Sequence, residues 1–166
     1  ETIYTVIVVI LLVLAILGLV VGVSNDAVNF LNSAIGSKAA SRKVIFTIAS
    51  VGILLGTMPS SGMMEVARSG VFYPEMFTFR DVMMLFLGVM FANVILLDLF
   101  NTFGLPTSTT VSLVFGLLGA AVAVTSLKIS ADPTLTAADM SNYINSGKAL
   151  VIISGILASV AIAFVV

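Results

Sequence analysis

A run of twenty-one residues without a charged side chain, Ile3–Val23, lies near the start of the sequence. A helix needs about 20 apolar residues to cross the hydrocarbon core of a bilayer, so this run is long enough to span it. Charged residues make up only 9% of the 166-residue chain, whereas soluble domains carry about 25%. The sequence therefore predicts an all-α integral membrane protein.

Hydrophobic segments recur along the whole chain. Five are found, at about 3–23, 44–58, 82–97, 111–127 and 149–166. The second and third are short for a span, so we expect each to continue as helix into more polar sequence. The polar stretch 128–147 predicts a connecting loop with a short helix from Thr136 to Tyr143. We expect a single transmembrane domain over residues 1–166.

Residue types that are absent narrow the chemistry. The chain has no cysteine and no histidine, which excludes disulfides, thiolate zinc sites, cysteine nucleophiles and histidine acid–base catalysis. The formal charge is -1, and the seven basic residues are scattered, so nucleic acid is not an expected partner. We expect no enzyme activity, because no catalytic constellation is recognisable.

A polar cluster, Gly22–Asp26, interrupts the first apolar run. Ser, Asn and Asp are favoured N-caps, so we expect a broken helix near 22–26 and a second helical stretch from Ala27 to Ser37. One face of that stretch gathers polar or small residues: Asn25, Asn29, Asn32 and Gly36. The alternative is a surface loop with an ordinary cap, but the number of amides on one face favours a binding site.

A second interruption lies between Asp98 and Thr110. Gly104 is suited to end one helix and Pro106 to open the next, so we expect a re-entrant or broken helix near 104–107. Four consecutive hydroxyl residues, Thr107–Thr110, would then lie in the first turn of the new helix. A capped turn between two spans needs only one of them. The surplus favours a ligand site over a simple turn.

The chemistry of such breaks follows from electrostatics. A helix start offers unpaired N–H groups and about half a positive charge, and discontinuous helices in transporters use these ends to bind anions. Hydroxyls and amides suit a tetrahedral oxyanion. Asp26 could accept its proton or bind sodium, and so could Asp98, which follows the apolar segment Val82–Leu97 directly. The residues favour an oxyanion site with a coupling cation.

Two ordered motifs carry a resemblance to a known family. The first is Asn-Asp-Ala-Val-Asn through Ile-Gly-Ser-Lys in Asn25–Lys38, and the second is Asn-Thr-Phe-Gly-Leu-Pro-Thr-Ser-Thr-Thr in Asn101–Thr110. They resemble the signature segments of the inorganic phosphate transporter (PiT) family, and the match covers about 20–127. Ser60–Arg68 is similar to the bacterial branch. The resemblance implies a secondary transporter of phosphate, coupled to sodium or protons, in a bacterial inner (cytoplasmic) membrane.

The resemblance and the acidic positions together assign the expected site. The phosphate-binding residues would be Asn25, Thr107, Ser108, Thr109 and Thr110. The cation-binding residues would be Asp26, Asn29, Asp98 and Asn101, with sodium at Asp26 and Asn29. No cofactor is expected, and a sodium ion could serve as the coupling ion.

Each motif occurs once, whereas the family's transporters need two inverted repeats with the substrate between them. We therefore expect one half of an inverted-repeat transporter, similar to the amino-terminal repeat of a bacterial member. It would be part of a longer chain, a half that pairs with itself or another chain, or an engineered single repeat. Phosphate, the lipid bilayer and a second repeat are the expected partners. Two other functions stay open: transport of another oxyanion such as sulfate, and a non-transporting membrane scaffold.

Overall fold

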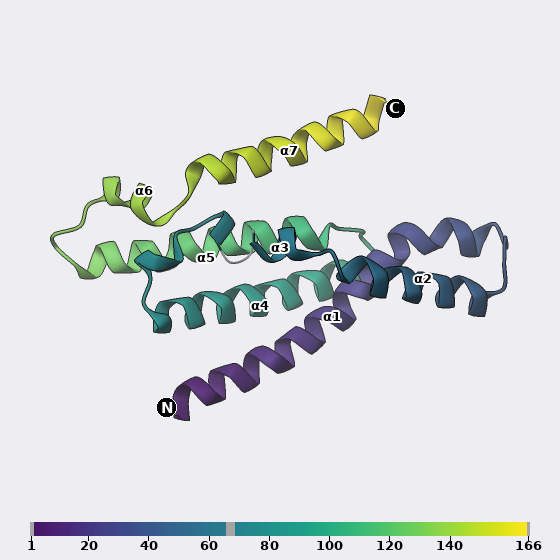
Figure 1. The fold of residues 1–166 in the computed structure, drawn as a ribbon, viewed down its shortest axis with the longest axis horizontal. Helices are drawn as coiled ribbons and strands as arrows, with labels where there is room; N and C mark the ends of the chain where they lie inside the picture. Colours follow the sequence, from purple (N-terminus) through teal and green to yellow (C-terminus); the bar gives the residue numbers. More distant parts are fainter. Residues whose placement is uncertain (1, 66–68, 166) are drawn as a thin grey trace.

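The computed structural model describes residues 2–65 and 69–165, and helices account for most of them (Figure 1). Their bounds are α1 Thr2–Gly36, α2 Arg42–Thr57, α3 Ser61–Glu65, η2 Pro74–Met76, α4 Phe79–Thr102, α5 Thr109–Ala131, η3 Ala137–Asp139, α6 Met140–Tyr143 and α7 Ser146–Val165. Within these two ranges the one β-bridge joins Phe72 to Ile144. The predicted all-α fold is confirmed.

Among the residues that the structure describes, four helices are long and apolar enough to cross a membrane: α1 as far as Ala27, α4, α5 and α7. The shortest of these segments, α7, has 20 residues, or about 30 Å at 1.5 Å per residue. The helix α2 is apolar but has only 16 residues. Four of the five predicted hydrophobic segments therefore reach spanning length, and the chain is an integral membrane protein.

The helix α1 is continuous through Gly22–Asp26, so the broken helix predicted there was wrong. The polar side chains of this cluster do not act as caps. Ser24 Oγ donates to Val20 O, 2.8 Å away within the same helix, and the Asn25 amide bonds groups on the segment after α4. Because these groups are satisfied without a chain break, the helix passes through them.

Near the second predicted break the chain turns between α4 and α5, two helices that are each of spanning length. Leu105 N donates to Phe100 O at 2.8 Å and Gly104 N to Asn101 O at 3.1 Å, which is the Schellman pattern that ends helices. Gly104 has a φ of 66°, a left-handed conformation that glycine adopts without the strain of a side chain. After this turn α5 runs back antiparallel beside α4 (Figure 1).

The start of α5 differs from the prediction by three residues. Pro106 does not open the helix; it lies before Ser108, the N-cap, whose Oγ accepts from Val111 N at 3.3 Å. Only Thr109 and Thr110 of the four hydroxyl residues occupy the first turn. The hydroxyl of Ser108 meets the ordinary need for a cap, and Thr107 stays in the turn.

The best-packed region surrounds the first half of α4 and the middle of α5. Its buried side chains include Leu85 and Val89 from α4 and Leu117 from α5. Two short segments pair at the edge of this region. Tyr73 N donates to Tyr143 O at 2.9 Å, and Asn145 N donates to Val71 O at 3.1 Å. The helix α7 diverges from this core in Figure 1, and Ala149 is its one buried residue among those described.

The polar connector between α5 and α7 is shorter than the predicted 128–147, because α5 continues to Ala131. It holds η3 and α6, which together match the short helix predicted from Thr136 to Tyr143. Asp139 accepts hydrogen bonds from the backbone and hydroxyl of Thr136, and these bonds hold the pKa of its carboxyl below the usual value. The connector is thus an ordered polar cap on this end of the bundle.

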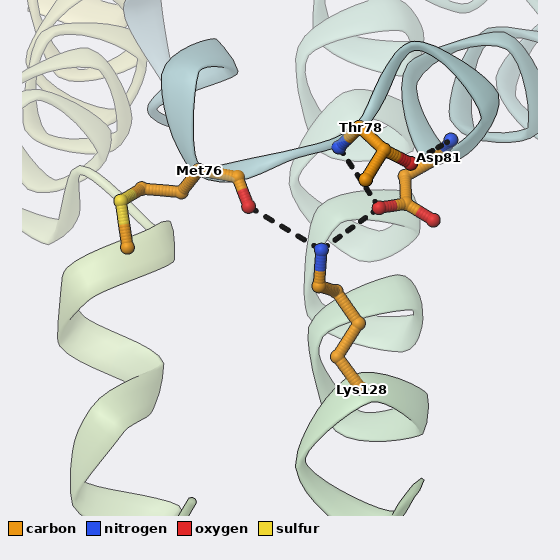
Figure 2. Close-up of polar contacts among 4 residues, drawn as sticks. All are labelled: Met76, Thr78, Asp81 and Lys128. Atoms are coloured by element: carbon orange, nitrogen blue, oxygen red, sulfur yellow. Dashed lines mark hydrogen bonds and ion pairs between the residues drawn. The ribbon is translucent and has the colours of Figure 1, made fainter. Parts of the chain in front are cut away.

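Lys128 contacts several segments at the same end of the bundle (Figure 2). Its Nζ lies 2.8 Å from Asp81 Oδ2 and 3.4 Å from Met76 O, and it also sits 5.5 Å from the ring centre of Phe77. Asp81 in turn accepts from Thr78 N, closing a capping box at the start of α4. One cation therefore links the end of α5 to η2 and to α4.

Replacing Lys128 by methionine is expected to lower the free energy of unfolding by about 1–2 kcal/mol, because the half-buried Asp81 carboxylate loses its ion pair. Unfolding titrations in mixed micelles measure the effect. Lys148→Met is the matched control, since that side chain is exposed and has no ion pair within the described ranges. Equal losses in the two variants would contradict a fastening role for Lys128.

Candidate functional site

Asn25 joins α1 to the turn between α4 and α5. Its side chain is 2% exposed. Its Nδ2 donates to Asn101 Oδ1 at 2.8 Å and to Leu105 O at 3.2 Å, and its Oδ1 accepts from Thr107 N at 3.0 Å. The last two groups flank Pro106, which has no N–H of its own. The Asn25 amide therefore pairs with the backbone on both sides of the proline, much as a second peptide would.

Asn101 completes this connection. Its Nδ2 donates to Val21 O at 3.0 Å, so the last turn of α4 is bonded both to the backbone of α1 and to the Asn25 side chain. These bonds join residues about 80 positions apart. The two segments singled out in the sequence are therefore in direct contact. The bonds use three of the four hydrogen-bonding positions of the Asn25 amide and two of the four of the Asn101 amide.

A cavity of about 240 Å³ lies beside this contact, between α1, α4 and α5. A water molecule occupies about 30 Å³ in the liquid, so the cavity has room for a small ion and several waters. Most of its wall is apolar, and four polar side chains line it: Asp26, Asn93, Thr109 and Thr110.

Asp26 and Thr109 lie next to each other in the lining of the cavity. Thr109 Oγ1 donates to Asp26 Oδ2 at 3.2 Å. Both side chains are partly buried. Thr109 and Thr110 also begin α5, where the first N–H groups have no partner in their own helix and the helix dipole is positive. A carboxylate and a positively polarised helix start thus border the same cavity.

Two glycines let α1 come close to its neighbours here. A Cβ on Gly22 would lie 3.5 Å from Thr109 Cγ2 and 3.7 Å from Leu97 Cδ1, and one on Gly18 would lie 3.5 Å from Val94 Cγ2. These are ordinary van der Waals distances, so a methyl group fits at each position while a larger side chain does not. Both glycines line the cavity.

Asn93 is a site residue that the sequence reasoning missed. The segment Val82–Leu97 was treated as apolar throughout, yet the Asn93 Oδ1 accepts from Ser112 Oγ at 2.8 Å in the middle of the α4–α5 pair. Asn93 lines the 240 Å³ cavity and also a 290 Å³ groove on the α4–α5 surface. The signal was available, because a single amide in a membrane-spanning segment is a functional candidate.

The remaining predicted site residues lie around this centre rather than in it. Thr107 is partly buried and lines the 290 Å³ groove, and Ser108 caps α5. Asn29 and Asp98 are exposed and do not line the 240 Å³ cavity. The structure therefore brings together Asn25 with Asn101, and Asp26 with Thr109 and Thr110, and leaves the other two predicted cation residues apart.

The sequence model of the phosphate transporter family matches residues 21–166, which covers both contacting segments and the whole cavity apart from its first lining residues. The chain belongs to the phosphate transporter family. The match relates the chain to a family of transporters rather than to enzymes.

A curated relative in the phosphate transporter family is the protein described as "Putative phosphate permease TK2061" from Thermococcus kodakarensis, which is 34% identical over 98 residues. That alignment covers 58% of this chain and 24% of the relative. The chain thus spans about a quarter of the length of the relative it matches. No solved structure matches the chain.

Proposed function

We propose that this chain forms one half of a secondary transporter that moves inorganic phosphate across a membrane together with sodium or protons. The observation that carries the proposal is the family match over residues 21–166, which includes the polar cavity between α1, α4 and α5. The description of the Thermococcus kodakarensis relative as a phosphate permease supports the choice of phosphate.

The phosphate would bind against the start of α5. Thr109 and Thr110 supply unpaired N–H groups and hydroxyls, that of Thr109 once a cation has replaced it as the partner of Asp26. Asn93 Nδ2 has no hydrogen-bond partner within the described ranges. These donors can bind a tetrahedral oxyanion without a lysine or arginine. Asn25 and Thr107 would hold the turn in place, because their polar groups already bond each other. Ser108 would act as the cap.

Coupling to a cation follows from the charge of Asp26. A phosphate in the cavity would lie near that carboxylate, and two like charges about 4 Å apart repel by about 4 kcal/mol at an effective dielectric constant of 20. A sodium ion or a proton on Asp26 removes this repulsion. We therefore propose that Asp26 takes the coupling cation, with Thr109 as its neighbour.

A second repeat would complete the site. The polar cavity opens at the surface of the described residues, and the chain spans about a quarter of its relative. An inverted second repeat, from the same or another chain, would close the cavity on the substrate. We propose a bacterial inner membrane as its location, on the resemblance of Ser60–Arg68, of which 66–68 lie outside the described residues.

Calorimetry of the purified protein with phosphate and with sulfate, alongside its mass in detergent, tests the proposal. We expect saturable phosphate binding that Thr109→Val weakens about tenfold, one lost charge-assisted hydrogen bond. Gly22→Leu should abolish binding by filling the cavity, while Gly22→Ala fits. Thr102→Val, exposed and outside the cavity, is the control. Tighter sulfate binding would favour another oxyanion, and no binding by a folded monomer would favour a scaffold.

A further inference from the structure

The hairpin formed by the end of α1 and by α2 encloses a groove of about 510 Å³. All of its lining residues are apolar, among them Phe30, Leu31, Ile45 and Ile53. Its volume falls within the roughly 300–1,000 Å³ that is usual for ligand sites. Figure 1 shows this hairpin reaching away from the α4–α5 pair, so the groove is separate from the polar cavity described above.

The helix α2 carries exposed apolar side chains around its circumference. Phe46, Ile48 and Leu54 are 50%, 66% and 68% exposed. The hydroxyl of Thr47 does not make this surface polar, because its Oγ1 donates to Lys43 O within the helix at 2.8 Å. A helix that is apolar all round belongs in a protein core or in lipid. The other described residues do not cover these side chains, which leaves them open to lipid.

Basic side chains gather at one end of the groove. Lys38, Arg42 and Lys43 are exposed and lie on the loop and first turn of α2. The sequence has no acidic residue from Ala27 to Met64, and within the described ranges none of the three basic side chains forms an ion pair. The end of an apolar groove therefore carries three uncompensated positive charges.

The loop leaves this end of the groove open. Ala39 and Ala40 line it with small side chains. Ser41, the N-cap of α2, makes no side-chain capping bond, so the first N–H groups of the helix also remain available to an anion. From Arg42 to Ile53 the helix rises about 16 Å, close to the roughly 15 Å thickness of one leaflet's hydrocarbon layer.

We propose that this groove binds an anionic phospholipid, with an acyl chain between α1 and α2 and the headgroup phosphate at Lys38, Arg42 and Lys43. The apolar wall matches the acyl chain, and the three charges match the phosphate. Basic residues beside membrane helices attract anionic headgroups in this way. The inference does not rest on phosphate transport, because it uses none of the residues around the polar cavity.

Native mass spectrometry of the delipidated protein, titrated with phosphatidylglycerol or with phosphatidylcholine of the same acyl chains, tests the role of charge. We expect one phosphatidylglycerol to bind about tenfold more tightly than phosphatidylcholine. The triple variant Lys38→Gln, Arg42→Gln, Lys43→Gln should bind the two lipids equally. Saturating inorganic phosphate should not displace the lipid, because the acyl chain holds it.

A second pair of variants tests the groove itself. A Cβ on Gly52 or on Gly56 would have no neighbour within 4 Å, and only Gly52 lines the groove. Gly52→Leu should therefore fill the groove and weaken the binding of both lipids about tenfold, while Gly56→Leu should leave their binding unchanged. Circular dichroism of all variants establishes that they are folded.

Four results would overturn the proposal. They are an unchanged lipid preference in the triple variant, equal lipid binding by Gly52→Leu and Gly56→Leu, displacement of the lipid by inorganic phosphate alone, and a dimer that Gly52→Leu dissociates. The last result would mean that a second copy of the chain covers the groove.

Discussion

Asn25→Ala is expected to lower the free energy of unfolding by about 3 kcal/mol, one of the two largest single-residue effects we anticipate. The substitution removes three hydrogen bonds that join α1 to the turn after α4. It also leaves Leu105 O and Thr107 N, on either side of Pro106, without their partner. Because Asn25 is only 2% exposed, water does not fully replace the lost hydrogen bonds. Titration of unfolding with a denaturing detergent, followed by circular dichroism, measures the loss.

Asn29→Ala is the matched control for this prediction. Asn29 has the same side chain one helical turn further along α1, but it is exposed, so its loss should cost less than about 0.5 kcal/mol. Asn25→Asp should be at least as harmful as the alanine variant, because a carboxylate cannot donate to Asn101 Oδ1 or Leu105 O. Equal stability of the Asn25→Ala and Asn29→Ala proteins would show that the bonds do not hold the two segments together.

The positions of the long helices could be predicted from the sequence, because they depend on local composition. Runs of apolar residues predicted α1, α4, α5 and α7 to within a few residues at most ends. The turn between α4 and α5 was also predictable, since Gly104 supplies the left-handed conformation and Pro106 cannot continue a helix. These signals need no knowledge of what lies next to the chain in space.

The continuity of α1 could not be predicted in this way. Ser24, Asn25 and Asp26 read as caps because local patterns assume that polar side chains bond their own backbone. In the structure Asn25 instead bonds residues that are 76 to 82 positions away. A tertiary partner of this kind removes the need for a break, and only a folded chain reveals it.

Asn93 and the Lys128 cluster were missed for a different reason. Hydropathy averaged over a segment hides a single amide among apolar neighbours, so Asn93 was counted with them, although its pairing with Ser112 marks it as distinct. The bond between Lys128 and Asp81 joins two helix ends that are 47 positions apart. The Lys128–Asp81 pair cannot be found without the pairing of α4 with α5, whereas Asn93 could have been noted in the sequence as a single amide in an apolar segment.

The second large effect is expected for Asp26→Asn, which should abolish the dependence of phosphate binding on the coupling cation. In the parent protein we expect sodium or added protons to tighten phosphate binding about 100-fold, since this corresponds to about 2.7 kcal/mol of the roughly 4 kcal/mol of repulsion that the cation relieves. Asparagine keeps the shape of the side chain, and can still accept from Thr109 Oγ1, but it carries no charge. The variant should bind phosphate with the same affinity at every sodium concentration when the pH is held fixed.

Asp98→Asn is the control that decides between the two candidate carboxylates. Asp98 is exposed and does not line the cavity, so its neutralisation should leave the cation dependence intact. If the dependence survived in Asp26→Asn and disappeared in Asp98→Asn, the coupling cation would bind at Asp98, and the cavity between α1, α4 and α5 would hold the anion alone. Calorimetric titrations of phosphate at several sodium concentrations, with both variants in parallel, separate these outcomes because each carboxylate predicts a different variant that loses the sodium effect.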